Sequence, residues 1–210
     1  MDQTKENIVK AATELFAEKG FEHVTTREIC RAAGVNGALV NYHFQSKEGL
    51  YRECLMRVFR RADGQSIIKL VERVTDAASW RAALREWITR FSVAMHATKG
   101  GLAVTSRLYG REIHRPSSMH AFIRDEFFRP IYDSLFKLIR MAGKSETESR
   151  KWVISIWSQL SAVAFADESW QVLFRPKRTT AESWGRTFAD FVCAQVFAGL
   201  SYAGKENAHK

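Results

Sequence analysis

Several polar side chains between residues 36 and 47 could together contact a nucleic acid. Asn36 and Asn41 carry amides that offer both a donor and an acceptor, as base edges require. Tyr42, His43 and Lys47 can reach phosphates. Each has a plainer use, because Asn36 suits a helix N-cap, His43 suits capping or packing, and an isolated Lys47 suits a solvated surface. The pattern therefore depends on elements that present these groups on one surface.

The first such element is a short helix expected over residues 27–33. Either Thr25 or Thr26 can be its N-cap, and Glu28 is placed for the reciprocal contact of a capping box. Thr26 also lies where backbone N–H groups favour a phosphate. Arg27 faces outward in the first turn, where a solvated and a phosphate-bound guanidinium are both reasonable.

A second short helix is expected over residues 37–43, after a turn at residues 33–35 that contains Gly34. A glycine-containing turn of three to four residues between two helices is typical of a helix-turn-helix unit. The second helix of such a unit brings its N-terminal residues to base edges in the major groove. Gly37, Asn41 and Tyr42 should face outward. The residues expected to pack inside the corner are Ile29, Ala32, Val35, Leu39 and Val40.

Helical spacing of apolar residues continues on both sides of this unit, and no strand alternation is evident. A helix over residues 4–19 should end at Gly20 in a left-handed conformation. One long helix is expected from residue 47 to about residue 74. The chain is therefore predicted to be all-α, with further helices over residues 79–98, 102–113, 118–141 (kinked or split at Pro130), 146–171 and 180–200.

The composition of the 210 residues, with 46% hydrophobic and 26% charged, excludes a wholly disordered chain. The net charge of +9 suggests an anionic partner, but the excess is spread along the chain and equally fits a solvated basic surface. No apolar run is long enough for a membrane span, and the N-terminus lacks an apolar signal core, so we expect a cytoplasmic protein. Cys30, Cys54 and Cys193 lie far apart and should be small core residues.

Catalytic motifs such as GxSxG, HExxH and the P-loop are missing from the sequence. Glu112, His114 and His120 do not share one helical face, which disfavours a metal site. The adjacent carboxylates of Asp125 and Glu126 point to different sides of a helix. We therefore expect no enzyme, and we assign no catalytic residue, metal or cofactor.

The segment TTREICRAAGVNGALVNYHFQSKEGL, residues 25–50, resembles the DNA-binding head of TetR-family transcriptional regulators. Residues 8–21 resemble the first helix of that head, so the resemblance covers about residues 4–52. Two positions depart from the common pattern, since Asn36 stands where Ser is usual and Asn41 where Tyr is usual. Either difference can change which operator is recognised without changing the mode of binding.

The resemblance implies about nine helices, in an N-terminal helix-turn-helix domain and a C-terminal ligand-binding and dimerisation domain. We place the first at residues 1–50, the second at 51–204 and a flexible tail at 205–210. It also implies a homodimeric regulator of a double-stranded DNA operator, in most members a repressor released by a small molecule. A helical adaptor or ligand-binding protein without DNA function is the alternative. The expected DNA contacts are Thr26, Arg27, Asn36, Gly37, Asn41, Tyr42, His43 and Lys47.

Two charge-free stretches, residues 152–166 and 191–204, suggest a dimer interface. A helix that is apolar all round must be buried, and pairing with the same helices of a second copy would form a four-helix interface. The alternative is that both helices are central core of one chain. The interface residues expected from this argument are Trp152, Ile156, Leu160, Phe188, Phe191, Gln195 and Gly199.

Aromatic side chains in the middle of the chain suit either a plain core or an apolar effector pocket. A kink at Pro130 would leave room for a ligand, and an arginine could pair with an acidic group or remain a surface charge. We expect an aromatic or amphipathic effector that can be anionic. Its predicted contacts are Trp87, Phe91, Met95, Tyr109, Arg111 and Phe122.

Overall fold

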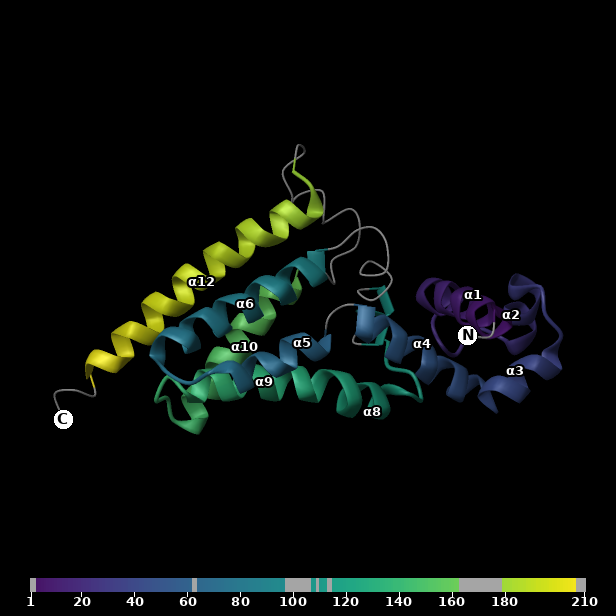
Figure 1. Ribbon diagram of the computed structural model, residues 1–210, viewed down its shortest axis with the longest axis horizontal. Helices are drawn as coiled ribbons and strands as arrows, with labels where there is room; N and C mark the ends of the chain where they lie inside the picture. Colours follow the sequence, from purple (N-terminus) through teal and green to yellow (C-terminus); the bar gives the residue numbers. More distant parts are fainter. Residues whose placement is uncertain are drawn as a thin grey trace. The chain divides into compact units, whose positions relative to one another are not determined.

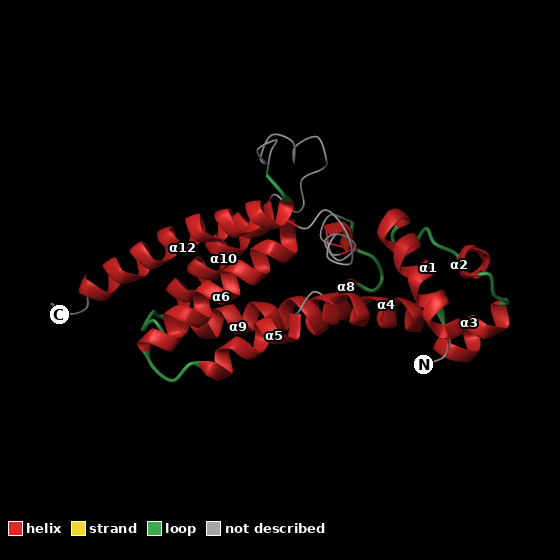
Figure 2. Cartoon of the chain, turned by 45° about the horizontal axis from the view of Figure 1, so that its top comes forward, coloured by secondary structure: helices red, strands yellow, loops and turns green. Residues whose placement is uncertain are grey.

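The computed structural model describes residues 3–61, 64–96, 107–108, 110–112, 115–162 and 179–206. These residues form ten α-helices with short 3-10 and π turns and contain no strand (Figure 2), which confirms the all-α prediction. Their contacts divide the chain into two compact units. Unit 1 holds residues 1–63 and 99–125, and unit 2 holds residues 64–98 and 126–210.

Unit 1 is built on α1 (Gln3–Lys19), α2 (Thr26–Ala33), α3 (Gly37–Phe44) and α4 (Lys47–Arg61), labelled in Figure 1. α1 packs against both α2 and α4. Its apolar face, with Ile8 and Phe16 fully buried, supplies the centre of the core. α1 ends at Gly20, whose φ of +83° is the left-handed conformation predicted there.

A later stretch of the chain completes unit 1. Residues 107–108 and 110–112 are helical, and α8 (His120–Ile123) follows. The helix expected over residues 102–113 otherwise lies outside the described residues. Unit 1 is thus larger than the DNA-binding domain of residues 1–50; that boundary, and a sensing domain over 51–204, stay predictions.

The single long helix expected from residue 47 to about residue 74 is wrong. α4 ends at Arg61, α5 covers Gly64–Lys69 and a 3-10 turn covers Leu70–Arg73. Gly64 has the weakest helix propensity of any residue but proline, so a break costs little there. The break coincides with the boundary between the two units.

Unit 2 contains α6 (Ala77–His96), α9 (Arg129–Arg140), α10 (Glu146–Ala162) and α12 (Ala181–Glu206). α6 and α12 run side by side in both ribbon views and make the most extensive helix contact of the described residues. The approach is close, because a Cβ on Gly185 would lie 3.0 Å from the Cα of Val93. The hydroxyl of Ser92 also donates to the Gly185 carbonyl over 2.8 Å.

Pro130 interrupts the helix expected over residues 118–141, as predicted. The described residues there form α8, a π turn over Arg124–Phe128 and then α9. Pro130 lies in the first turn of α9, where its missing N–H leaves no helical hydrogen bond unmade.

The remaining helix bounds differ from expectation by small amounts. α6 begins two residues early because Asp76 caps it, accepting the Ser79 N–H over 2.7 Å. α10 is described to residue 162, so its expected end at residue 171 lies outside the described residues, whereas α12 runs to Glu206, past the expected end at residue 200. No helix among the described residues is long and apolar enough to cross a membrane.

Candidate nucleic-acid interface

The N-terminus of α2 carries the capping box that the sequence suggested, with Thr25 as the N-cap. The Thr25 hydroxyl oxygen accepts the Glu28 N–H over 3.2 Å, and the Thr25 N–H donates to the Glu28 carboxylate over 2.9 Å. Lys19 bonds the same carboxylate over 2.8 Å. The hydrogen bond from Lys19, followed by those from Thr25, lowers the pKa of Glu28 to about 2. Thr26 is therefore the first residue of α2 and is half-buried.

The turn between α2 and α3 is set by Gly34, which has a φ of +66° and a ψ of +34°. Behind it, the Val35 N–H donates to the Cys30 carbonyl over 3.0 Å. Ile29 and Val40 close the inside of the corner and are fully buried, as predicted.

Ala32, which was also expected in the corner, is exposed. It lies two residues from the buried Cys30, on the opposite side of α2. The other predicted corner residues, Val35 and Leu39, are half-buried.

α3 presents an outer face that we define by the exposed residues Gly37, Ala38, Asn41 and Tyr42. Their i, i+3 and i+4 spacing places them on one side of the helix. Tyr42 is 81% exposed, an unusual fraction for a large ring. Such a face, unsupported by other side chains, is free to enter a groove of about helix width.

Asn36 precedes this face and is the N-cap of α3. Its side-chain oxygen accepts the Ala38 N–H over 3.1 Å, so the capping interpretation is confirmed. The NH₂ group of the same amide remains on the exposed side.

Two exposed cations flank the corner on α2. Arg27 and Arg31 are four residues apart and therefore share a helix face. Among the described residues no ion pair is recorded for either guanidinium. His43 is half-buried, and its ring lies 5.0 Å from the Tyr42 ring and 6.0 Å from the Phe44 ring.

Lys47 has a structural role that the sequence did not reveal. Its ammonium donates to the carbonyls of Phe21 and Val24 over 2.8 and 3.0 Å. The same nitrogen lies 4.3 Å from the centre of the Phe21 ring. A lysine has three donors, so a phosphate would meet the remaining one. Lys47 thus joins the start of α4 to the connection between α1 and α2.

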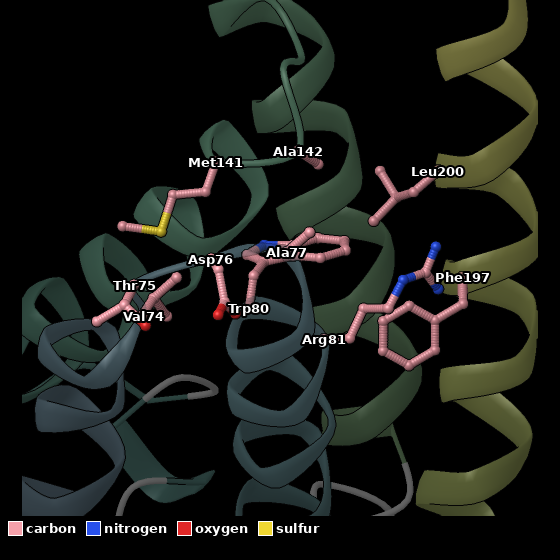
Figure 3. A pocket seen from close by; sticks show the side chains of 10 residues that line it. All are labelled: Val74, Thr75, Asp76, Ala77, Trp80, Arg81, Met141, Ala142, Phe197 and Leu200. Carbon is pink, nitrogen blue, oxygen red and sulfur yellow. The ribbon is translucent and has the colours of Figure 1, made fainter.

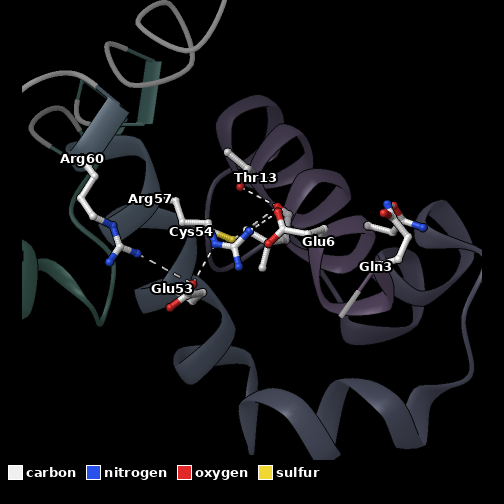
Figure 4. A network of polar contacts seen from close by, with 9 residues as sticks. Gln3, Glu6, Thr13, Glu53, Cys54, Arg57 and Arg60 are labelled. Atoms are coloured by element: carbon white, nitrogen blue, oxygen red, sulfur yellow. Dashed lines mark hydrogen bonds and ion pairs between the residues drawn. The ribbon is translucent and has the colours of Figure 1, made fainter. Parts of the chain in front are cut away.

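An ion-pair network holds α1 against α4 (Figure 4). Arg57 of α4 bonds Glu6 of α1 over 2.5 Å and Glu53 over 2.7 Å. Cys54 lies beside them, and burial raises the pKa of its thiol to about 12. These contacts fix the support on which α2 and α3 rest.

The stretch around residues 111–118 docks onto this support. The buried Glu112 accepts from the Tyr51 hydroxyl over 3.0 Å and from the N–H and hydroxyl of Ser117 over 3.1 and 3.0 Å. The guanidinium of Arg111 donates to the carbonyls of Ala17 and Glu18, at the last turn of α1.

The predicted effector contacts fall in different places. Arg111 belongs to unit 1, as does Phe122, whose ring lies 4.4 Å from the Arg52 guanidinium. Trp87, Phe91 and Met95 all belong to α6 in unit 2. Tyr109 lies outside the described residues.

The three residues on α6 pack in the core of unit 2. Trp87 is fully buried and donates its indole N–H to the Ser134 hydroxyl over 2.9 Å. Its ring stacks on Phe91 with centroids 5.0 Å apart, and Phe91 lies 4.9 Å from the Trp157 ring. Met95 is half-buried against the same cluster.

A pocket of about 480 Å³ opens elsewhere in unit 2 (Figure 3). The Arg81 guanidinium lies 5.5 Å from the Phe197 ring and 5.9 Å from the Trp80 ring. The pocket thus combines aromatic surface with a cation, but includes no predicted effector contact. It is lined by Val74, Thr75, Asp76, Ala77, Trp80, Arg81, Met141, Ala142, Phe197 and Leu200.

The predicted dimer residues are of two kinds. Ile156 and Leu160 are fully buried within unit 2. Trp152 covers Gly199 so closely that a Cβ there would lie 2.3 Å from the Trp152 ring.

Other residues of α10 and α12 face outward. Phe191 is 55% exposed and Gln195 is exposed, while Phe188 is half-buried. Ile154 on α10 is 61% exposed and was missed, although it lies in a stretch that the sequence marked as charge-free.

Comparison with known proteins shows what the corner formed by α2 and α3 resembles. Residues 8–54 match the family model for bacterial regulatory proteins of the tetR family. Residues 8–54 are therefore similar to the N-terminal domain of this family. This is a family of regulatory proteins and not of enzymes, as the missing catalytic motifs predicted. Among the described residues, no three His, Cys, Asp or Glu side chains gather as a metal site requires.

Two curated relatives are similar to this chain. The transcriptional dual regulator CecR of Shigella flexneri is 30% identical over 143 residues, which are 66% of this chain and 64% of CecR. The probable transcriptional regulator YttP of Bacillus subtilis is 45% identical over 47 residues, 22% of this chain and 23% of YttP. The chain therefore matches less than two thirds of the length of either relative.

Solved structures share the fold over nearly the whole chain. A TetR-like regulator from Rhodococcus sp. RHA1 has a TM-score of 0.66 at 16% identity, covering 96% of this chain and 97% of that one. The hemolysin II regulator HlyIIR has a TM-score of 0.63 at 21% identity, covering 92% and 97%. At these identities the likeness shows the fold, an N-terminal helix-turn-helix followed by a helical C-terminal domain.

Proposed function

We propose that this chain is a sequence-specific transcriptional regulator that places α3 in the major groove of a double-stranded DNA operator. The observation that carries the proposal is the outer face of α3, which is exposed on a rigid corner within the residues that match the tetR family. Helix-turn-helix proteins use this helix, and the N-terminal part of it, to meet base edges.

The residues around the outer face suit phosphate contacts. Thr26 lies at the N-terminus of α2, and Arg27 is exposed in its first turn. Tyr42 and His43 follow at the C-terminal end of α3, and Lys47 retains one N–H for a phosphate. Asn36 can donate from its NH₂ group while its oxygen caps α3.

The test is operator selection from random DNA with the full-length protein, followed by titration at rising salt against competitor DNA. We expect binding that weakens with salt and survives the competitor. Tyr42→Ala should weaken binding to all selected sequences, whereas Asn7→Ala at an exposed position of α1 should not. A chain that selects no sequence above competitor would refute the proposal and favour a helical adaptor.

We also propose that the regulator acts as a homodimer through α10 and α12. Support comes from the exposed apolar side chains of Phe191 and Ile154 and the uncharged Gln195 beside Phe191. Large apolar interfaces are typical of obligate dimers. This surface would be lined or supported from within unit 2 by Phe188, Trp152, Gly199, Ile156 and Leu160.

Light scattering on the purified protein tests the dimer. Phe191→Glu should halve the mass, because the charge would be buried at the interface. Asn7→Glu adds the same charge at an exposed position of α1 and should leave the mass unchanged. A wild-type monomer at micromolar concentration would refute the dimer.

A small-molecule effector completes the proposal. We propose that it binds the second domain and favours dimers in which the spacing of the two DNA-binding domains no longer fits the operator. The protein, acting as a repressor in the cytoplasm, would then be released from DNA. The contacts that the sequence predicts are Trp87, Phe91 and Met95 of unit 2, Arg111 and Phe122 of unit 1, and Tyr109, which lies outside the described residues. Thermal-shift screening of aromatic and amphipathic carboxylates, then operator release by any hit, is the test. A complete lack of stabilisation would count against an effector of this class.

A further inference from the structure

We propose that α3 recognises A·T base pairs, with Asn41 bonding an adenine and Ala38 packing on a thymine methyl group. This inference rests on the proposed function and adds the base chemistry that the corner can recognise. It starts from a difference between Asn36, which precedes the outer face of α3, and Asn41, which lies on that face.

Asn36 is poorly oriented for the paired contact that an amide makes with adenine, because its oxygen points to the N-terminus of α3. That contact needs the side-chain oxygen to accept from N6 and the NH₂ group to donate to N7. The oxygen of Asn36 is already bonded to the Ala38 N–H over 3.1 Å. Breaking that bond would remove the N-cap of α3 and destabilise the helix.

Asn41 has both ends of its amide available. It is exposed, and among the described residues no hydrogen bond is recorded for its side chain. Its backbone carbonyl accepts the Gln45 N–H, so the backbone at this position is fixed. The geometry therefore points to Asn41 as the adenine-reading residue.

Guanine is disfavoured because α3 offers no suitable donor. The usual partner for guanine is an arginine or lysine that bonds O6 and N7 together. The helix sequence GALVNYHF contains neither residue. Lys47, which follows, already donates to the carbonyls of Phe21 and Val24. Arg27 and Arg31 lie on α2, the helix that crosses the DNA backbone in such units.

Ala38 provides the second contact. It is exposed three residues before Asn41, about 4.5 Å away along the helix axis. Base pairs stack about 3.4 Å apart, so the two side chains reach the same or neighbouring pairs. An alanine methyl packs on the C5-methyl group of thymine. Gly37 beside it is also exposed and adds no bulk that would hold α3 away from the bases.

The test uses the full-length protein and the operator obtained by selection, with single bases replaced by analogues. 7-Deazaadenine removes only the N7 acceptor, and uracil in place of thymine removes only the methyl group. We expect 7-deazaadenine at one position of each half-site to weaken binding by about 2-fold to 12-fold, because it removes one of the two hydrogen bonds. Uracil at the same or a neighbouring pair should weaken binding a few-fold.

The variants connect each effect to its residue. Asn41→Ala should abolish the sensitivity to 7-deazaadenine, and Ala38→Gly the sensitivity to uracil. Asn7→Ala is the control: it makes the same Asn-to-Ala change at an exposed position of α1 and should leave both sensitivities intact.

Three results would overturn the inference while leaving a DNA-binding function in place. One is sensitivity to 7-deazaguanine in place of 7-deazaadenine. Another is an Asn41→Ala variant that weakens all sequences equally, which would indicate a phosphate contact. The third is an Asn41→Ala variant that keeps the wild-type response to 7-deazaadenine. Failure of selection itself would instead contradict the proposed function.

Discussion

The hydrogen bond between Tyr51 and Glu112 is expected to hold two distant stretches of unit 1 together. Tyr51 is 1% exposed and Glu112 is 3% exposed, and the hydroxyl donates to the carboxylate over 3.0 Å. The Tyr51 ring packs on Phe16 and Phe21, with centroids 4.7 and 4.9 Å away. Phenylalanine would keep these ring contacts, so Tyr51→Phe removes the hydroxyl alone.

The expected loss follows from the partners that Glu112 keeps. A hydrogen bond to a charged group contributes about 1.5–3 kcal/mol. The second carboxylate oxygen would still accept from the N–H and hydroxyl of Ser117. We therefore expect Tyr51→Phe to lower the free energy of unfolding by about 1.5–2 kcal/mol, the lower part of that range.

Urea denaturation of Tyr51→Phe, Glu112→Gln and the double variant measures this contribution. The cycle should give an interaction energy of at least about 1 kcal/mol, because the two groups are in contact. Tyr42→Phe is the matched control, since Tyr42 is 81% exposed and should change stability by less than about 0.5 kcal/mol. A Tyr51→Phe variant as stable as the control, or additive effects in the cycle, would refute the reasoning.

Three further predictions concern reactivity, pH and the interface. Burial raises the pKa of Cys54 to about 12 and of Cys193 to about 11, so neither thiol should react with a maleimide at pH 8 before urea unfolds the chain. The hydrogen bond from Lys19 is the main reason that the pKa of Glu28 is lowered to about 2. The ionised Glu28 carboxylate therefore stabilises the folded state fully above the unfolded pKa of about 4.3, and this contribution is lost as pH falls toward 2. Acid unfolding of Glu28→Gln, followed by circular dichroism, should lack the loss of stability that comes from protonating Glu28. An acid-unfolding curve identical to that of the wild type would contradict this prediction. Gly37→Ala should leave the melting temperature unchanged or raise it, since a Cβ there meets nothing within 4 Å. The same substitution should weaken operator binding. Equal losses of thermal stability and of operator affinity would argue against an exposed N-terminus of α3.

Local chemistry made the helix-turn-helix corner predictable. The capping box at Thr25, the left-handed Gly34 and the N-cap at Asn36 each depend on residues no more than three positions apart. Such contacts are visible in sequence because the partners are neighbours. The same holds for Pro130, which is tolerated in the first turn of a helix and disfavoured in its interior.

Tertiary contacts were not predictable in the same way. The sequence could not show that the helix after Lys47 stops at Arg61, since the apolar spacing continues across Gly64. It also could not separate core aromatics from pocket aromatics. Trp87 and Trp80 have similar sequence surroundings, yet Trp87 is fully enclosed while Trp80 lines an opening.

Lys47 and Arg111 show why cations mislead a search for anionic ligands. The sequence suggests a phosphate for one and an acidic effector for the other, but both donate to backbone carbonyls near the end of α1. Carbonyls at a helix C-terminus have no helical partner and attract cations. Both side chains therefore satisfy the C-terminal end of α1 and the connection after it. Their positive charge remains, but their geometry is fixed by the fold, so under the proposed function sequence recognition rests with the neutral groups on the outer face of α3.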